Sequence, residues 1–148
     1  MAQHTQEQPV VVCESGRGPY QQTLLAGKHR LVADEPVALG GADSGPAPID
    51  LLLGSLGACT SITLRMYADR KRIPLTGIRV ELSHCTTEAD GHRRGERIAR
   101  RITLHGDLTE EQRKSLLAIA NKCPIHRLLQ AEIRIVSELV DAARGGDR

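Results

Sequence analysis

The chain has 148 residues and a formal net charge of +2, from 20 basic and 18 acidic residues. That length fits one domain with an aliphatic core, because Phe and Trp are absent. The near-neutral charge, with only Tyr20 and Tyr67 available to stack on bases, argues against a nucleic-acid partner. No basic start precedes an apolar run, and no uncharged apolar stretch reaches about 18 residues, so no membrane association is expected. We expect one cytoplasmic domain over residues 1–148, with flexible ends at 1–8 and 140–148.

The N-terminal third alternates short apolar runs with glycine-rich turns. A β meander is expected from this pattern, with strands at residues 9–15, 20–26 and 29–34. Cys13 lies in the first strand and is expected to be a small buried apolar residue. A loop follows at residues 33–48 (ADEPVALGGADSGPAP), and a loop so rich in glycine and proline beside a helix is more often functional than accidental.

A long helix is predicted from near Ile49 to about Arg72. Pro48 suits the first helical turn, and Asp50 adds a negative charge there. Apolar positions then recur at three- and four-residue steps, through Leu52, Leu56, Cys59, Thr63 and Tyr67. Cys59 is therefore expected on the buried stripe, where the surrounding small residues let a second backbone or a substrate approach the sulfur. Because so long an apolar helix exceeds what one small core covers, a homodimer is expected.

The second half of the chain reads as a hairpin, two helices and a strand. The hairpin strands are expected at residues 77–90 and 97–108, with charges on the outward face. Thr109 and Gln112 match a capping box for the next helix. Cys123 precedes Pro124 and would cap a helix over 124–132, where free backbone N–H groups favour the thiolate. A last strand is expected at 132–139.

Two cysteine–histidine pairs of the sequence could supply metal ligands. His84 and Cys85 are adjacent in a predicted strand, so their side chains point to opposite faces. The Cys123-x-x-His126 pair has no partner CxxC or HxxxH. No metal or other bound cofactor is therefore expected.

Cys59 and Cys123 together fit a peroxidatic and a resolving thiol. The first would attack an O–O bond to give a sulfenic acid, and the second would condense with it to a disulfide. This chemistry needs a cation to hold the thiolate and an acid or base to orient the hydrogen-bond donor. The candidates are Arg17, Arg30, Asp34, Glu35 and Asp50. Arg17 is preferred, because a glycine-flanked turn can fold its side chain over the site.

Four segments of the chain, HRLVADEP, GG…GPAP, DLLLGSLGACTSITLRMYADRK and NKCPIHRLL, resemble the OsmC/Ohr family of osmotically inducible and organic-hydroperoxide-resistance proteins. The resemblance covers roughly residues 10–138. It implies an α+β fold with β-sheets around long central helices, in an intertwined homodimer with sites at the subunit interface. It also makes Cys59 the peroxidatic thiol and Cys123 the resolving thiol.

The supporting residues of the family are matched less closely. Arg17 in SGRGP is similarly placed to the family's arginine, which follows two glycines. The family's glutamate falls on Ile49, so that Asp50, one residue on, is the candidate acid.

The leading hypothesis is a thiol peroxidase that reduces organic hydroperoxides to alcohols. It would form a Cys59 sulfenic acid and then a Cys59–Cys123 disulfide. An external dithiol such as a lipoyl protein would then restore the thiols. The alternative is a dimeric, non-enzymatic binding or stress-response module for an apolar small molecule, or a redox sensor.

Overall fold

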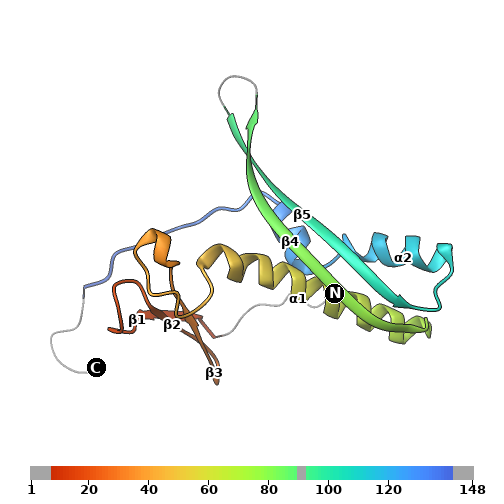
Figure 1. Cartoon of the computed structure of the whole chain (residues 1–148), viewed down its shortest axis with the longest axis horizontal. Coiled ribbons are helices and arrows are strands. Elements are labelled where there is room, and N and C mark those ends of the chain that lie inside the picture. Colours follow the sequence, from red (N-terminus) through yellow and green to blue (C-terminus); the bar gives the residue numbers. More distant parts are fainter. Residues whose placement is uncertain (1–7, 90–92, 142–148) are drawn as a thin grey trace.

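Two antiparallel sheets and three α-helices make up the chain in a computed structural model that describes residues 8–89 and 93–141 (Figure 1). The first sheet contains β1 (Val11–Glu14), β2 (Gln22–Ala26) and β3 (His29–Ala33), and the second is the hairpin of β4 (Leu75–Ala89) and β5 (Arg93–Gly106). The helices are α1 (Pro48–Lys71), α2 (Glu110–Ala120) and α3 (Pro124–Gln130), with a short 3-10 turn η1 (Val37–Leu39). The expected α+β class is confirmed. The ends expected to be flexible lie almost entirely outside the described residues.

The N-terminal sheet is the predicted β meander, with strand order β1-β2-β3. Gly27 has φ +58° in the turn between β2 and β3, a conformation that glycine adopts without strain. The substantial contacts of this sheet are within itself, whereas α1 packs on β4, α2 and α3. Cys13 is consequently exposed, and its predicted burial is wrong for this chain, because among the described residues no helix or second sheet packs substantially on the strand that carries it.

Helix α1 has the predicted bounds to within one residue. Its buried positions are Leu56, Thr60, Leu64 and Ala68, a line of four-residue steps. The predicted stripe through Cys59 is therefore shifted by one residue, which is about 100° around the helix. Cys59 lies on the flank of the buried line and is partly exposed.

The core lies where α1, α2 and the start of β4 meet. Its buried members are Leu64, Ala68, Leu75, Leu116 and Ala120. Alanines on both helices let the two backbones approach closely. On the β4 side, a Cβ atom at Gly57 would lie 2.8 Å from Leu82 Cδ1, so this glycine allows α1 to lie close to the hairpin.

The start of α2 follows the predicted capping box. The backbone N–H of Gln112 donates to Thr109 Oγ1 at 3.2 Å, and the backbone N–H of Thr109 donates to Gln112 Oε1 at 3.0 Å. On the hairpin, the expected outward charges are exposed, and Arg79 pairs with Glu81 at 3.2 Å. The second hairpin strand begins at Arg93, four residues before its predicted start at 97, and residues 90–92 lie outside the described residues.

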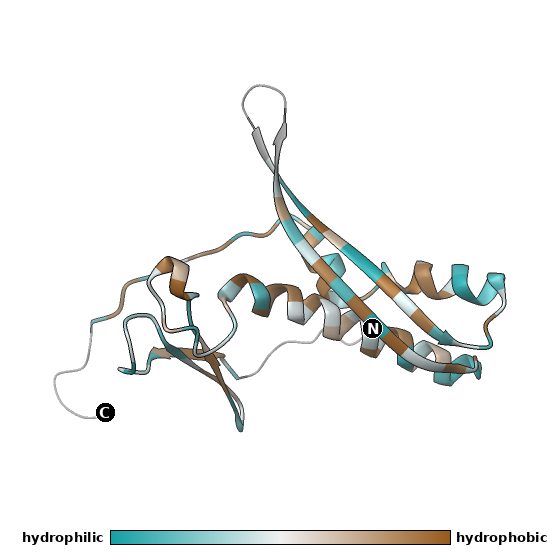
Figure 2. Cartoon of the chain, viewed as in Figure 1, coloured by the Kyte–Doolittle hydropathy of each residue, from teal (hydrophilic) through white to brown (hydrophobic). Residues whose placement is uncertain are grey.

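The C-terminal strand predicted at 132–139 is absent. Helix α3 ends at Gln130, and the described segment after it pairs with no described strand. Ile135 is 85% exposed and Leu139 is 100% exposed. Apolar and polar residues nevertheless alternate there as in a strand, visible as brown and teal bands beyond α3 (Figure 2). The prediction is wrong for the single chain, because strand formation requires a hydrogen-bonded neighbour.

Many large apolar side chains of the described residues are exposed. Ile62 and Met66 on α1 are each 59% exposed, and Val12 and Leu31 on the N-terminal sheet are about half exposed. Among the described residues, α1 is also the one helix long and apolar enough to cross a membrane by length and composition, a test that the core helix of a globular protein also passes.

We predict that this surface is covered by a second copy of the chain. Exposed apolar patches of this extent favour self-association, since covering them removes apolar area from water. Sedimentation at micromolar concentration should therefore give a homodimer. A stable, folded species of 16.1 kDa under those conditions would refute the prediction.

Candidate active site

Cys59 lies in the middle of α1, partly exposed beside the buried line of the helix. Burial raises the pKa of its thiol, and the neighbouring Cys123 raises that pKa further. The backbone N–H of Ile125 and the hydroxyl of Thr63 act in the opposite direction, because each hydrogen-bonds the sulfur. The main influences on this pKa include no cation, so in the described chain Cys59 favours the protonated thiol.

Cys123 is fully buried at the N-cap of α3, as the sequence predicted. Its sulfur accepts a hydrogen bond from the backbone N–H of His126 at 3.3 Å, and Pro124 occupies the first turn. Both cysteines are free thiols. The fold brings Cys123 beside the turn of α1 that carries Cys59, since Cys123 Sγ lies 3.8 Å from the hydroxyl of Thr60, the residue after Cys59.

Arg100 is the residue that sequence reasoning missed. It projects from β5 toward the thiol pair, where its Nη1 donates to Thr60 Oγ1 at 2.8 Å and to the carbonyl of Ala120 at 3.3 Å. Its Nη2 donates to Asn121 Oδ1 at 2.8 Å. Thr60 Oγ1 in turn lies 3.8 Å from Cys123 Sγ. A signal was present in the sequence, because Arg100 shares a strand face with Ile98 and Ile102 and interrupts an apolar row.

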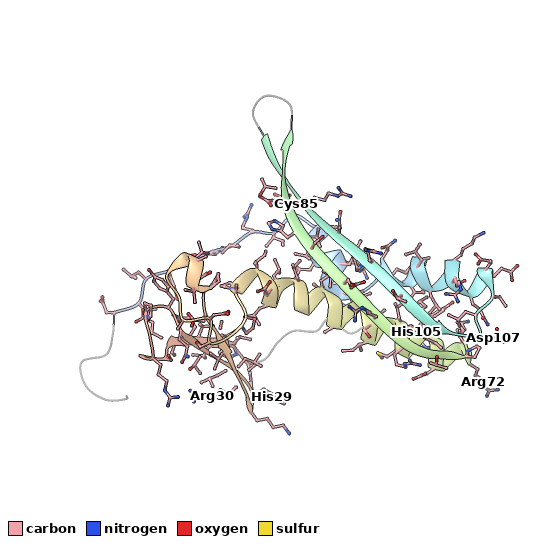
Figure 3. The ribbon with its side chains drawn as sticks, viewed as in Figure 1. His29, Arg30, Arg72, Cys85, His105 and Asp107 are labelled. Carbon is pink, nitrogen blue, oxygen red and sulfur yellow. The ribbon has the colours of Figure 1, made fainter. Side chains whose placement is uncertain are left out.

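The two candidate arginines of the N-terminal sheet lie away from the thiols in the described chain. Arg17 is exposed in the turn between β1 and β2, and within the described residues its side chain has no hydrogen bond or ion pair. Arg30 lies near the β2–β3 turn and donates to Thr23 Oγ1 at 3.2 Å (Figure 3). The hydrogen bond of the Arg30 side chain is thus made to β2 and not to α1.

The candidate acid Asp50 is part of the helix start. Its Oδ2 accepts a hydrogen bond from the backbone N–H of Ala47 at 3.2 Å, which ties the incoming loop to the first turn of α1. Nine residues separate it from Cys59, or about 13 Å along the helix axis at 1.5 Å per residue. Within one chain, Asp50 and Cys59 are therefore not brought together.

Asp34 organises the glycine-rich loop. Its buried carboxylate accepts hydrogen bonds from Ser44 Oγ at 2.6 Å and from the backbone N–H groups of Ser44, Glu35 and Ala42. These bonds, that of the Ser44 side chain foremost, hold the pKa of Asp34 below its ordinary value. The loop closes tightly over this residue, since a Cβ at Gly41 would lie 1.9 Å from the Glu35 carbonyl oxygen. Asp34 therefore anchors the loop, with both carboxylate oxygens occupied by it.

The cysteine–histidine pairs are used for other contacts. His84 pairs with Glu96 across the β4–β5 hairpin, and Cys85 is exposed on β4 (Figure 3). At α3, the backbone N–H of His126, rather than its ring, contacts Cys123. The chemistry that the arrangement offers is that of two adjacent thiols and backbone donors.

Comparison with known proteins gives a family match and similar folds. Residues 41–138 match the family model described as OsmC-like protein, and no curated protein matches the chain. Among solved structures, an OsmC-like protein from Mycoplasma pneumoniae has a TM-score of 0.70 at 19% identity, covering 85% of this chain and 89% of that one. An osmotic stress induced and detoxification response protein from Psychrobacter arcticus has a TM-score of 0.68 at 22% identity, covering 85% and 91%. An organic hydroperoxide resistance protein OsmC from Legionella pneumophila has a TM-score of 0.61 at 19% identity, covering 84% and 90%.

At these identities the solved structures establish the fold, and the family assignment rests on the family model. That model spans residues 41–138, which is more than half of the 148-residue chain. The resemblance of the chain to the OsmC/Ohr family is thereby confirmed, and the chain belongs to the OsmC-like family.

Proposed function

We propose that this protein is a thiol peroxidase that reduces organic hydroperoxides to alcohols. The observation that carries the proposal is the placement of the fully buried thiol of Cys123 beside the helix turn that bears Cys59, with Cys123 Sγ 3.8 Å from the hydroxyl of the adjacent residue Thr60. A peroxide-related stress role agrees with the OsmC-like family and with structural neighbours named for hydroperoxide resistance. Two free thiols supply the two electrons that reduction of one O–O bond requires.

The reaction is balanced by these two residues and one external dithiol. The Cys59 thiolate attacks the outer oxygen of ROOH, the O–O bond breaks, and the alkoxide leaves and takes a proton to become ROH. Cys59 then carries a sulfenic acid. The sulfur of Cys123 attacks it, the S–O bond breaks, and water leaves as the Cys59–Cys123 disulfide forms. An external dithiol, such as the lipoyl group of a carrier protein, reduces the disulfide by thiol–disulfide exchange.

A second copy of the chain supplies what the single chain lacks. Burial raises the pKa of Cys59, so a cation is needed to hold the reactive thiolate at neutral pH. Arg17 is our candidate, because its turn is exposed and its side chain is uncommitted within the described residues. In a homodimer whose N-terminal sheet packs on the partner's long helix, this turn would lie beside the partner's thiols. Asp50 is the candidate to orient the arginine, and the assembly is proposed to be cytoplasmic.

The roles of the two thiols are separable by substitution. Cys59→Ser should abolish hydroperoxide consumption, because no nucleophile remains. Cys123→Ser should still consume about one equivalent and stop at the sulfenic acid or a higher oxide. Consumption of cumene hydroperoxide in single-turnover and steady-state assays measures both, with the exposed Cys13→Ser and Cys85→Ser as controls that stay active.

Two results would overturn these roles. Full turnover by Cys59→Ser would show that another group attacks the peroxide. No consumption by the wild-type protein with any organic hydroperoxide would favour the binding-module or redox-sensor alternative.

Two substitutions of Arg17 separate the effect of its charge from the effect of its paired hydrogen-bond donors. Arg17→Lys keeps the charge but loses the paired donors, and should lower the peroxidase rate about tenfold or more, which is at least about 1.4 kcal/mol. Arg17→Ala should raise the pH at which Cys59 is alkylated, because a cation that stabilises the thiolate lowers the thiol pKa. Arg30→Ala is the matched control on the same sheet. If Arg30→Ala is inactive while both Arg17 variants react normally, the cation comes from β3 instead.

A further inference from the structure

Arg100 joins the helix that carries Cys59 to the turn that carries Cys123. Its partner on α1 is Thr60, the residue after Cys59. Its other partners, Ala120 and Asn121, lie at the end of α2, within three residues of Cys123. One guanidinium therefore fixes the spacing between the two segments that bear the thiols, with donors spread over both of its terminal nitrogens.

The placement of a cation here is unexpected on grounds of stability alone. Arg100 is partly buried, and within the described residues its acceptors are a hydroxyl, a carbonyl and an amide oxygen, with no carboxylate among them. An apolar residue would continue the inward row of Ile98 and Ile102 without the desolvation of a charge. The hydrogen bonds it makes thus point to a role in positioning.

The hydrogen-bond inventory of Thr60 defines that role. A hydroxyl has one proton to donate and two lone pairs to accept with. Thr60 donates its proton to the carbonyl of Leu56 at 2.7 Å and accepts from Arg100 at 2.8 Å. The hydroxyl oxygen that Arg100 holds lies 3.8 Å from Cys123 Sγ, and the backbone N–H of His126 donates to that same sulfur. Thr60 therefore fixes the position of Cys123 from α1, while the N-terminus of α3 fixes it from the other side.

We propose that Arg100 and Thr60 are positioning residues for disulfide formation, which hold the turn that carries Cys123 beside the turn of α1 that carries Cys59. The proposal rests on the peroxidase function proposed above. In the resolving step, Cys123 gives its proton to the hydroxyl that leaves the Cys59 sulfenic acid, and water departs. A thiol held nearby reacts with the sulfenic acid before a second hydroperoxide does, so the pair protects Cys59 from oxidation to the sulfinic acid.

The test compares disulfide with sulfinic acid at Cys59, by intact-protein mass spectrometry after a small excess of cumene hydroperoxide. Thr60→Val keeps the shape but removes the hydroxyl, and Arg100→Met removes the donors. Each should raise the ratio of sulfinic acid to disulfide about five- to tenfold, the loss expected for one or two hydrogen bonds. The rate at which the first equivalent of hydroperoxide is consumed should change less than about twofold. Thr60→Ser restores the hydroxyl and should behave as wild type.

Arg101→Met is the matched control, since Arg101 is the exposed neighbour on the outward face of the same strand. If Thr60 and Arg100 were merely structural, Thr60→Val and Arg100→Met would lower the thermal stability, the rate of hydroperoxide consumption and the rate of disulfide formation together. The ratio of sulfinic acid to disulfide would then stay unchanged, and Thr60→Ser would have no separate effect on that ratio. An unchanged ratio in both Thr60→Val and Arg100→Met overturns the proposal.

A second measurement needs no hydroperoxide. Equilibration with a glutathione redox buffer reports the effective concentration of Cys59 toward Cys123, and it should fall about five- to tenfold in Thr60→Val and Arg100→Met. This measurement does not involve peroxide chemistry, so it still tests the positioning role of Arg100 and Thr60 if the protein proves not to be a peroxidase. An effective concentration equal to wild type in both variants would show that Arg100 and Thr60 do not position the thiols.

Discussion

The packing of α2 against α1 determines where the second thiol lies. Leu64 and Ala68 on α1 meet Leu116 and Ala120 on α2, and all four are buried. The same seam continues to Thr60 on one helix and to Cys123 just beyond the end of the other. A slip of one helical turn along this seam, about 5.4 Å, would separate Cys123 from Cys59. The aliphatic core and the redox pair therefore depend on one interface, so core packing is part of the proposed chemistry.

A second copy of the chain would meet two needs of the single chain. Among the described residues, its N-terminal sheet and C-terminal segment expose apolar side chains, and the segment after α3 pairs with no strand. Burial raises the pKa of its proposed nucleophile, Cys59, and the main influences on that pKa include no cation. A second copy that covers the apolar surface would also bring charged residues to Cys59. In that account, reactivity appears only on assembly, which keeps the thiol of an isolated chain unreactive.

Features set by local chemistry were predictable from the sequence, and features set by tertiary or quaternary partners were not. Prolines and caps located both thiol-bearing helices, including the N-cap position of Cys123, because these signals act within one turn. The predicted buried face of α1 was wrong by one residue, because the face that is buried depends on where α2 packs. The exposure of Cys13 and the unpaired segment after α3 were also missed, because the sequence pattern shows a strand without naming its neighbour. Arg100 was detectable as a charge in an inward apolar row, although its partners were not.

The central claim is that Cys59 and Cys123 act as one redox pair toward hydroperoxides. Non-reducing mass spectrometry after a stoichiometric dose of cumene hydroperoxide tests it most directly. We expect one equivalent of cumyl alcohol, the loss of two hydrogens from the protein, and a single linked peptide pair that contains Cys59 and Cys123. Alcohol formation without that linkage, or an unchanged mass with both thiols still open to alkylation, would contradict the account.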